Sequence, residues 1–201
     1  MDLILVRHAT STRVELGVWS RLFDAPLKGG FEAELAGTAS EIGGLTDPMV
    51  FSSPLARCRA TAAHIYPRRP VHIVDSLRAY HSGRFEGATE AEVLAAQPGY
   101  ADLSYQDKFR APRFGEESIA EQTERVLRGF AEVLKHDAAT TVIVAHYSSI
   151  NIMANTVEPD PSGVDRVYDL KAGGYWRTSV DAVALRSRLA GRGGDSAEEG
   201  Q

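Results

Sequence analysis

The chain has 201 residues, of which 43% are hydrophobic and 24% are charged, and its formal net charge is −5. This length predicts one α/β domain with a substantial core rather than two domains. The negative charge excludes a general nucleic-acid binder, because no basic excess is available to displace counterions from a phosphate backbone. A single cysteine, Cys58, excludes an intramolecular disulfide framework and a cysteine-rich metal site.

The first apolar stretch, residues 3–6, is four residues long and runs directly into Arg7 and His8. It is too short for a secretory signal, and nothing approaches the roughly 20 apolar residues that a membrane-spanning helix needs. We therefore expect a soluble, cytoplasmic protein with no membrane partner. The use of one cysteine fits a reducing compartment.

The first third of the chain alternates between predicted strands and helices. Residues 3–6 are rich in β-formers and predict a buried strand, and residues 31–42 predict a helix that stops at a pair of glycines. A second strand, 50–51, leads into a helix over 54–66. Ser53 can cap that helix, with proline at the first helical position.

The middle of the chain continues the alternation. Residues 71–74 predict a third strand and residues 90–96 a short helix. A longer helix is expected over 118–136, where Ser118 and Glu121 have the spacing of a capping box.

The last third holds the β-branched run 141–145, which is the strongest strand, and residues 178–185, which alternate as an antiparallel edge strand would. Alternating strands and helices predict a three-layer α/β/α fold with a mostly parallel central sheet. We assign residues 1–190 to one domain. The tail 191–201 has almost no apolar side chains and is expected to be disordered.

Two segments, 11–30 and 98–115, are long, mixed in polarity and punctuated by glycine or proline. Structureless loops of this length in a compact domain are usually functional or disordered. Ser11 and Arg21 in the first loop and Arg110 in the second are candidate substrate-binding residues. Aromatic and basic groups together suit a substrate with a ring or a second anionic group, and they equally suit a loop that its aromatics anchor.

Two histidines, His8 and His146, each follow a predicted buried strand directly. In open parallel sheets, ligands bind at the carboxyl ends of the strands. Each histidine alone would be read as a strand terminator or a satisfied core residue. Their shared position favours a functional site.

Two arginines accompany these histidines. Arg7 follows the first strand without an intervening turn, and Arg57 lies one turn into the helix expected after Ser53. A buried guanidinium without a partner is costly, and a bound anion would remove that cost. Two arginines can bind phosphate oxygens with paired hydrogen bonds, a geometry that lysine cannot reproduce.

The residues around these side chains resemble the motifs of the histidine phosphatase superfamily. Residues 5–11 (LVRHATS) resemble the Arg-His-Gly signature that opens the family. Further segments resemble family motifs in the same order: 24–27 (DAPL), 52–62 (SSPLARCRATA), 115–118 (GEES) and 142–146 (VIVAH). The resemblance spans residues 3 to about 150.

The resemblance implies a phosphoglycerate mutase-like fold and an enzyme that acts on a small phosphorylated substrate. His8 would be the nucleophile that forms a phosphohistidine, and Arg7, Arg57 and His146 would stabilise charge on the transferring group. Water would then accept the phosphoryl group. No metal and no other cofactor is implied, because the cationic cluster supplies the electrostatic stabilisation.

One departure from the family pattern concerns the general acid. Many members carry a glutamate that protonates the leaving group where this chain has Ala79. His81 or Glu86 could donate the proton instead, although each can also be a solvated surface residue. Alternatively, the substrate has a good leaving group, such as a phosphohistidine or an acyl phosphate, or the protein has left phosphatase chemistry.

Three other departures lie near the expected pocket. Ala9 replaces the usual glycine, and Val14 stands where many members have a substrate-contacting asparagine. Tyr147 replaces a small residue after the second histidine, so its ring either borders the pocket as a substrate-binding residue or points into the core. Together these changes indicate a substrate other than phosphoglycerate.

The leading hypothesis is thus a metal-independent phosphatase of a small phosphorylated metabolite. A mutase is disfavoured, because it needs tight control of water and the acid position is empty. A protein phosphohistidine or regulatory phosphatase, and a relative that performs another reaction or only binds an anion, remain alternatives. A dehydrogenase and a serine hydrolase are excluded, since neither a glycine-rich turn after the first strand nor a Gly-x-Ser-x-Gly elbow is present. The oligomeric state stays open.

Overall fold

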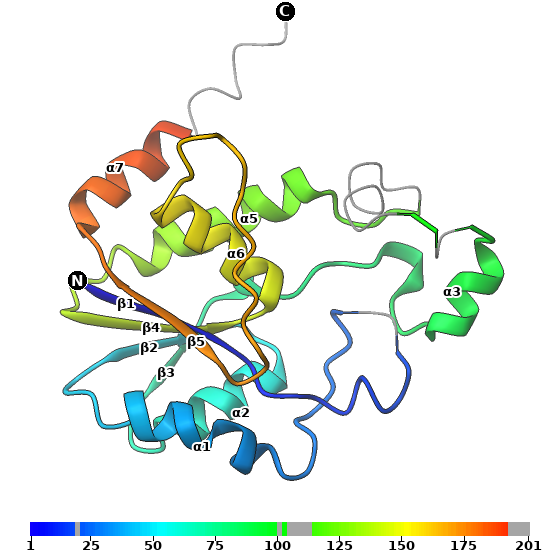
Figure 1. Cartoon of the computed structure of the whole chain (residues 1–201), viewed down its shortest axis with the longest axis horizontal. Helices are drawn as coiled ribbons and strands as arrows, with labels where there is room; N and C mark the ends of the chain where they lie inside the picture. The colour runs from blue at the N-terminus through cyan, green and yellow to red at the C-terminus, as the bar shows by residue number, and fades with distance from the viewer. Residues whose placement is uncertain (19–20, 100–101, 104–113, 193–201) are drawn as a thin grey trace, which may run out of the picture.

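The computed structural model describes residues 1–18, 21–99, 102–103 and 114–192. It contains one five-stranded sheet with the strand order β3-β2-β4-β1-β5, in which only the edge strand β5 is antiparallel (Figure 1). The strands are β1 (Asp2–Arg7), β2 (Met49–Ser52), β3 (Val71–Ile73), β4 (Thr140–Ala145) and β5 (Tyr175–Ser179). The expected mostly parallel sheet is confirmed.

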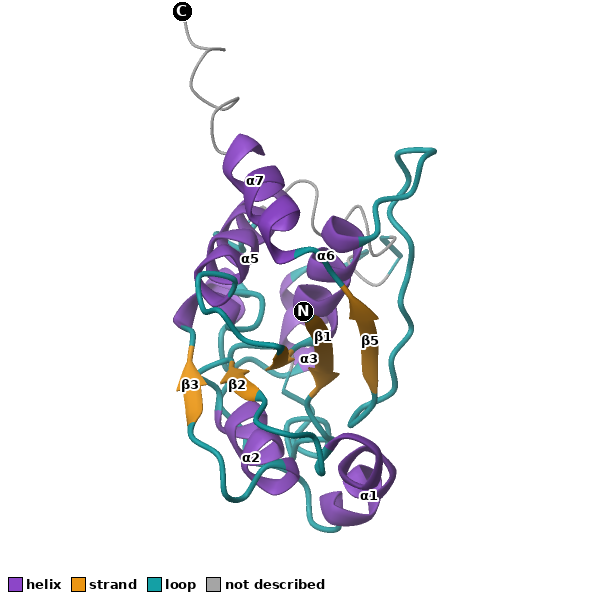
Figure 2. Cartoon of the chain, turned by 90° about the vertical axis from the view of Figure 1, so that its left-hand side faces the viewer, coloured by secondary structure: helices purple, strands orange, loops and turns teal. Residues whose placement is uncertain are grey.

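Helices cover both faces of this sheet (Figures 1 and 2). One face carries α1 (Phe31–Ile42) and α2 (Ala56–Ile65), and the other carries α5 (Ile119–Val133), α6 (Tyr147–Val157) and α7 (Ala182–Arg192). A short helix, α3 (Glu90–Ala96), lies beyond the carboxyl ends of the central strands. The three-layer α/β/α architecture is therefore confirmed. Among the residues that the structure describes, no helix is both long enough and apolar enough to cross a membrane.

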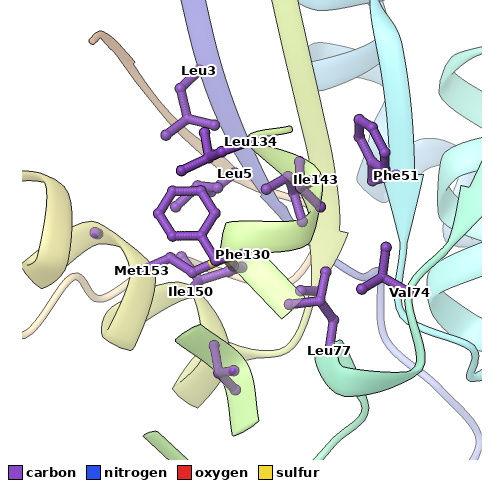
Figure 3. Close-up of a cluster of buried hydrophobic side chains, with 14 of the residues drawn as sticks. Leu3, Leu5, Phe51, Val74, Leu77, Phe130, Leu134, Ile143, Ile150 and Met153 are labelled. Carbon is purple, nitrogen blue, oxygen red and sulfur yellow. The ribbon is translucent and has the colours of Figure 1, made fainter. Parts of the chain in front are cut away.

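The central strands are buried on both faces, as their continuous apolar runs predict. Leu3 and Leu5 of β1 pack with Phe130 of α5 in one core, which Figure 3 shows in close-up. Ile4 and Val6 pack into a second core under α1 and α2. Because successive side chains of a strand point to opposite faces, one short run supplies both cores.

In the second half of the chain, one predicted strand is wrong and one helix was not predicted. The segment 178–185 is not one strand, because β5 ends at Ser179 and α7 begins at Ala182. The Asp181 carboxylate accepts hydrogen bonds from the amides of Val183 and Ala184 at 2.9 and 3.0 Å, which starts a helix there. Helix α6 also follows β4 directly, where no helix was expected. Its sequence is rich in β-branched and polar residues, so its burial rather than its propensity holds it in place.

The start of α2 also differs from the prediction. Ser53 does not cap the helix, which begins at Ala56 with Leu55 in the N-cap position and no side-chain cap from that residue. Instead, the Asp24 carboxylate accepts a hydrogen bond from the Ala56 amide at 2.6 Å. A residue from the preceding loop thus satisfies the first free amide of the helix, and Ser53 is left for another role.

Close packing around Gly129 yields a stability prediction. A Cβ atom at this helix position would lie 2.8 Å from the Cβ of Ser76 and 3.3 Å from a methyl of Val74. We expect Gly129→Ala to lower the free energy of unfolding by about 1 kcal/mol or more, since overpacking outweighs the gain in helix propensity. Urea denaturation followed by circular dichroism measures this change.

Gly37 of α1 is the matched control, because a Cβ atom there would meet nothing within 4 Å. Gly37→Ala should raise the free energy of unfolding by about 0.5–1 kcal/mol. If both substitutions stabilised the protein, the close contact between α5 and the segment at Ser76 would be contradicted.

Candidate active site

Parallel pairing brings the two histidines together. Strands β1 and β4 are in register with Arg7 opposite Ala145, so the next residues, His8 and His146, lie side by side at the carboxyl edge of the sheet. Their ring centroids are 5.2 Å apart and their planes are inclined by 65°. Residues that are 138 positions apart in sequence therefore share one site.

Hydrogen bonds determine which nitrogen of His8 carries the proton. Nδ1 lies 2.7 Å from the carbonyl oxygen of Ala9, and a carbonyl only accepts, so Nδ1–H is the donor. Nε2 accepts a hydrogen bond from Nε of Arg57 at 3.3 Å. The lone pair of this imidazole is therefore on Nε2 and points toward Arg57.

The environment keeps His8 neutral. Burial is the largest cause and lowers the pKa of His8 to about 3, and the positive charge of Arg57 acts in the same direction. The hydrogen bond to the Ala9 carbonyl opposes the shift. An uncharged imidazole at neutral pH keeps a lone pair on Nε2, and the hydrogen bond from Arg57 to that nitrogen has to be exchanged before Nε2 can attack phosphorus.

Arg57 connects the histidines to the loop that follows β1. Its side chain is 2% exposed, and its two terminal nitrogens donate hydrogen bonds to the carbonyls of Phe23 at 3.0 Å and Arg21 at 2.6 Å. Nη2 also lies 3.5 Å from Nδ1 of His146. Burial lowers the pKa of this guanidinium, and the nearby charge of Arg21 adds to that effect.

Arg7 is held from three sides. Its backbone amide donates to the carbonyl of Gly174 at 2.9 Å, and Nη1 donates to the carbonyl of Leu170 at 2.6 Å. The guanidinium also lies over the Tyr147 ring at 5.1 Å from its centroid, a cation–π contact. Its Nε is buried and has no hydrogen-bond partner among the described residues, which leaves a donor for a ligand.

His146 is buried against α2. Its Nε2 lies 2.8 Å from the Ser53 hydroxyl, and the Cys58 thiol is 3.6 Å from the same nitrogen. Burial lowers the pKa of His146 well below its ordinary value, with His8 and Arg57 as further causes. Burial also raises the pKa of the Cys58 thiol to about 12, so this cysteine is a neutral packing residue and not a second nucleophile.

A cavity of about 110 Å³ lies at the carboxyl edge of the sheet, and its lining includes Arg7, His8, Arg57 and His146. Ser11, Arg21 and Tyr147, each predicted from the sequence as substrate-binding residues, also line it. Tyr147 therefore borders the cavity instead of pointing into the core. Arg110, the fourth predicted substrate-binding residue, lies outside the described residues.

Ala79, the position at which the sequence analysis expected a proton donor and found none, lies in the same cavity. Ala79 lines it together with Tyr80. His81 lines a different cavity, and its Nδ1 accepts a hydrogen bond from the Gly83 amide at 3.0 Å. The Glu86 carboxylate accepts a hydrogen bond from the Ser82 amide and is not among the residues that line the central cavity. The geometry thus gives no support to a proton-donor role for either residue.

A buried ion pair positions the Ala79 segment. Arg125 of α5 binds both carboxylate oxygens of Glu117 at 2.6 Å, and its Nη1 donates to the carbonyls of Ser76 and Arg78 at 2.7 and 3.0 Å. A planar guanidinium that is fully engaged in this way fixes the backbone that leads to Ala79. Helix α5 therefore positions the part of the cavity wall that contains Ala79.

Several residues that form or support the cavity were not assigned a role in the site from the sequence. Arg13, Tyr80 and Ser148 line it, and Ser53 supports His146. Arg13 had a local signal as a further basic residue in the loop after His8, and Ser53 lies in the segment 52–62 that resembles a family motif. No group of three or more potential metal-ligating side chains occurs among the residues that the structure describes.

Comparison with known proteins gives matches over most of the chain. Residues 3–168 match the model of the histidine phosphatase superfamily (branch 1). Phosphoserine phosphatase 1 of Hydrogenobacter thermophilus is 30% identical over 152 residues, which cover 73% of this chain and 71% of the relative.

Solved structures show the same fold at low sequence identity. Bacillus stearothermophilus YhfR superposes with a TM-score of 0.76 at 20% identity and covers 90% of this chain and 91% of its own. A putative alpha-ribazole-5'-P phosphatase from Escherichia coli has a TM-score of 0.74 at 19% identity, with 88% and 89% covered.

The lowered pKa of His8 predicts how stability depends on pH. Between about pH 6.5 and pH 3 the unfolded state binds a proton at this histidine and the folded state does not. Stability is therefore lost as the pH falls through this window, by about 1.4 kcal/mol per pH unit for one histidine. We expect His8→Asn to reduce the slope of the free energy of unfolding against pH by about 1.4 kcal/mol per pH unit between pH 6 and pH 4. Urea titrations at a series of pH values measure this slope.

The exposed His72 of β3 provides the control for this measurement. His72→Asn should retain the slope of the unsubstituted protein. An identical slope in His8→Asn would contradict a neutral His8.

Proposed function

Since the chain belongs to the histidine phosphatase superfamily, we propose that it hydrolyses a small phosphorylated metabolite through a phosphohistidine on His8. The observation that carries the proposal is the protonation state of this imidazole. Its Nδ1–H is committed to the Ala9 carbonyl, so the lone pair of Nε2 faces Arg57 and the cavity wall. A curated relative of similar length is named a phosphoserine phosphatase, which supports a small phosphomonoester as the substrate class.

The charge around His8 suits a phosphoryl dianion. Arg7 and Arg57 line the cavity beside it, and Arg7 has a buried Nε that lacks a partner in the described residues. The oxygens of a bound phosphoryl group would accept hydrogen bonds from these guanidinium groups and from a ring nitrogen of His146. A dianion raises the pKa of a nearby imidazole, so His146 would become a cationic donor when the substrate binds.

The reaction proceeds in two displacements. The Nε2 lone pair of His8 attacks phosphorus, the bond from phosphorus to the ester oxygen breaks, and the leaving oxygen takes a proton from solvent or a donor in the cavity. Water then attacks phosphorus, the bond to Nε2 breaks, and inorganic phosphate leaves. The covalent intermediate divides one difficult step into two easier ones, and preorganised donors stabilise the charge in both.

The proposal includes independence from metal ions. In phosphoryl transfer, a metal ion neutralises charge on the transferring oxygens. Two guanidinium groups and one imidazole that are already fixed around the cavity can supply the same stabilisation without reorganisation.

One observation favours a second candidate within the same chemistry. Ala79 lies in the cavity wall and cannot donate a proton, and neither His81 nor Glu86 lines that cavity. A substrate with a good leaving group, such as a protein phosphohistidine or an acyl phosphate, needs little acid assistance. Substrates of differing leaving-group pKa separate this candidate from an ordinary alkyl phosphate.

The nucleophile assignment is tested with a panel of phosphomonoesters assayed in a metal chelator. We expect turnover to survive the chelator and His8→Ala to reduce kcat by more than about 10³-fold, because both displacements pass through Nε2. The exposed His72→Ala is the matched control and should keep full activity. Activity retained by His8→Ala would remove the phosphohistidine, and loss of activity in chelator would remove metal independence.

A separate prediction concerns the protonation of the leaving group. Because His81 and Glu86 lie outside the wall of the central cavity, His81→Ala and Glu86→Gln should change kcat/KM for alkyl and aryl phosphates by the same factor. The measurement is the ratio of kcat/KM for p-nitrophenyl phosphate to that for an alkyl phosphate. A rise of this ratio by about 10²-fold in either variant would show that its side chain is the acid after all.

A further inference from the structure

The central cavity offers few groups that can give a proton to a leaving oxygen. No aspartate or glutamate is among its described lining residues, and Ala79 ends in a methyl group. Its arginines keep their protons in proteins, and the hydroxyls of serine and threonine are weaker acids than a phenol. Apart from the two histidines, the proton donors that remain in the described lining are the phenols of Tyr80 and Tyr147.

Both histidines are already engaged at phosphorus in the proposed reaction. His8 is the nucleophile, and its Nδ1–H donates to the Ala9 carbonyl at 2.7 Å. His146, whose Nδ1 lies 3.5 Å from Nη2 of Arg57, donates to an oxygen of the transferring group. The attacking and leaving atoms are roughly in line in phosphoryl transfer, so the ester oxygen lies across phosphorus from Nε2 of His8. That oxygen needs a different donor.

Tyr147 lies beside these histidines because of the chain path. It is the first residue of α6, which follows β4 and His146 directly at the carboxyl edge of the sheet (Figure 1). Its half-buried side chain lines the cavity. Within the described part of the chain its phenolic oxygen forms no hydrogen bond, although its backbone carbonyl accepts one from Asn151 at 3.0 Å. The phenol is therefore able to donate to a ligand in the cavity.

The contact with Arg7 favours loss of the phenolic proton. The guanidinium lies over the Tyr147 ring at 5.1 Å from its centroid. Burial is the main cause that lowers the pKa of Arg7, and the phenol of Tyr147 is the largest of the causes that oppose this shift. Because attraction between two charges is mutual, Arg7 equally stabilises the negative charge that proton transfer leaves on Tyr147. Arg7 is also a ligand of the phosphoryl group in the proposed site, so one guanidinium joins the phenol to the reaction centre.

The other phenol is in a different environment. Tyr80 is 5% exposed and follows Ala79, on the segment whose backbone Arg125 ties to α5. A leaving alcohol departs toward solvent, and the half-buried Tyr147 borders solvent, whereas the side chain of Tyr80 hardly does. The exposure of the two rings thus favours Tyr147 as the donor.

We propose that Tyr147 is the general acid for the leaving group, in place of the carboxylic acid that is missing at Ala79. This inference rests on the proposed phosphatase function, because it takes His8 as the nucleophile. Two departures from the family pattern then compensate each other. The chain lacks a glutamate in one wall of the cavity, and it has a phenol instead of a small side chain in another.

Both displacements balance with this donor. In the first, Nε2 of His8 bonds to phosphorus, the bond from phosphorus to the ester oxygen breaks, and that oxygen takes the phenolic proton as the alcohol leaves. The phenolate of Tyr147 stays beside the guanidinium of Arg7. In the second, the phenolate takes a proton from the attacking water, the bond to Nε2 breaks, and inorganic phosphate leaves with the phenol restored.

Two substrates with different leaving groups test this role. An alkoxide needs a proton in order to leave, whereas p-nitrophenolate does not. We expect Tyr147→Phe in the full chain to lower kcat/KM for an alkyl phosphate by about 10²-fold or more, and kcat/KM for p-nitrophenyl phosphate by less than about threefold. Steady-state assays of both substrates measure the ratio of the two values.

Three further measurements accompany this variant. Tyr147→Phe keeps the ring and with it the cation–π contact, so inorganic phosphate should inhibit it as strongly as the unsubstituted protein, which shows that the site is folded. Tyr175→Phe is the matched control and should keep both rates, because the Tyr175 phenol donates to Glu41 outside the cavity. Tyr80→Phe removes the other phenol and should leave the ratio unchanged.

The acid assignment and the phosphatase function fail in different ways. If Tyr147→Phe lowers kcat/KM for both substrates by the same factor, or changes neither, Tyr147 is not the acid although the protein is a phosphatase. A rise of the ratio in Tyr80→Phe alone moves the role to Tyr80 and overturns the proposal as well. If the unsubstituted protein hydrolyses no phosphomonoester, the phosphatase proposal fails and the acid assignment fails with it.

Discussion

The parallel pairing of β1 with β4 is the constraint on which the site depends. It sets Arg7 opposite Ala145, and each strand ends one residue before a histidine. A shift of one residue would turn one strand's apolar side chains to the wrong face of the sheet, so burial in the two cores enforces this register. The proximity of His8 and His146 is thus a consequence of how the core packs.

Arg57 organises the charges around that pair. It is buried, it contacts the imidazole of His8, and it donates to two carbonyls of the loop after β1. Those carbonyls take up donors that would otherwise be unpaired, and in return the arginine fixes the loop against α2. The proposed phosphoryl site and the loop after β1 are therefore connected through one side chain. Four arginines, and no carboxylate, are among the described residues that line the cavity.

Behind the cavity, a second guanidinium plays a structural part. Arg125 is saturated by Glu117 and by two backbone carbonyls, and it fixes the segment that presents Ala79. The segment is thus tied to α5, and Ala79 presents to the cavity a methyl group that cannot donate a proton.

Local sequence determined much of the architecture. The apolar runs at 3–6 and 141–145 gave the central strands, and Ser118 with Glu121 gave the capping box that starts α5. Such features depend on neighbours within a few residues, so periodicity and capping rules detect them. Helix α6 was not predicted, because its β-branched and polar residues form a helix only when one face of that helix packs against the core.

What the tertiary structure alone decided is which groups meet. Ser53 reads as a helix cap, yet its hydroxyl lies against His146 because Asp24, 32 residues before Ala56, satisfies the helix start instead. Arg13 reads as one charge in a long loop, and only closure of that loop brings it into the cavity. Chain sequence fixes the chemical type of each side chain and its local propensity. Long-range contacts between distant segments set distances and burial, and these determine the charge state of each group and its position in the site.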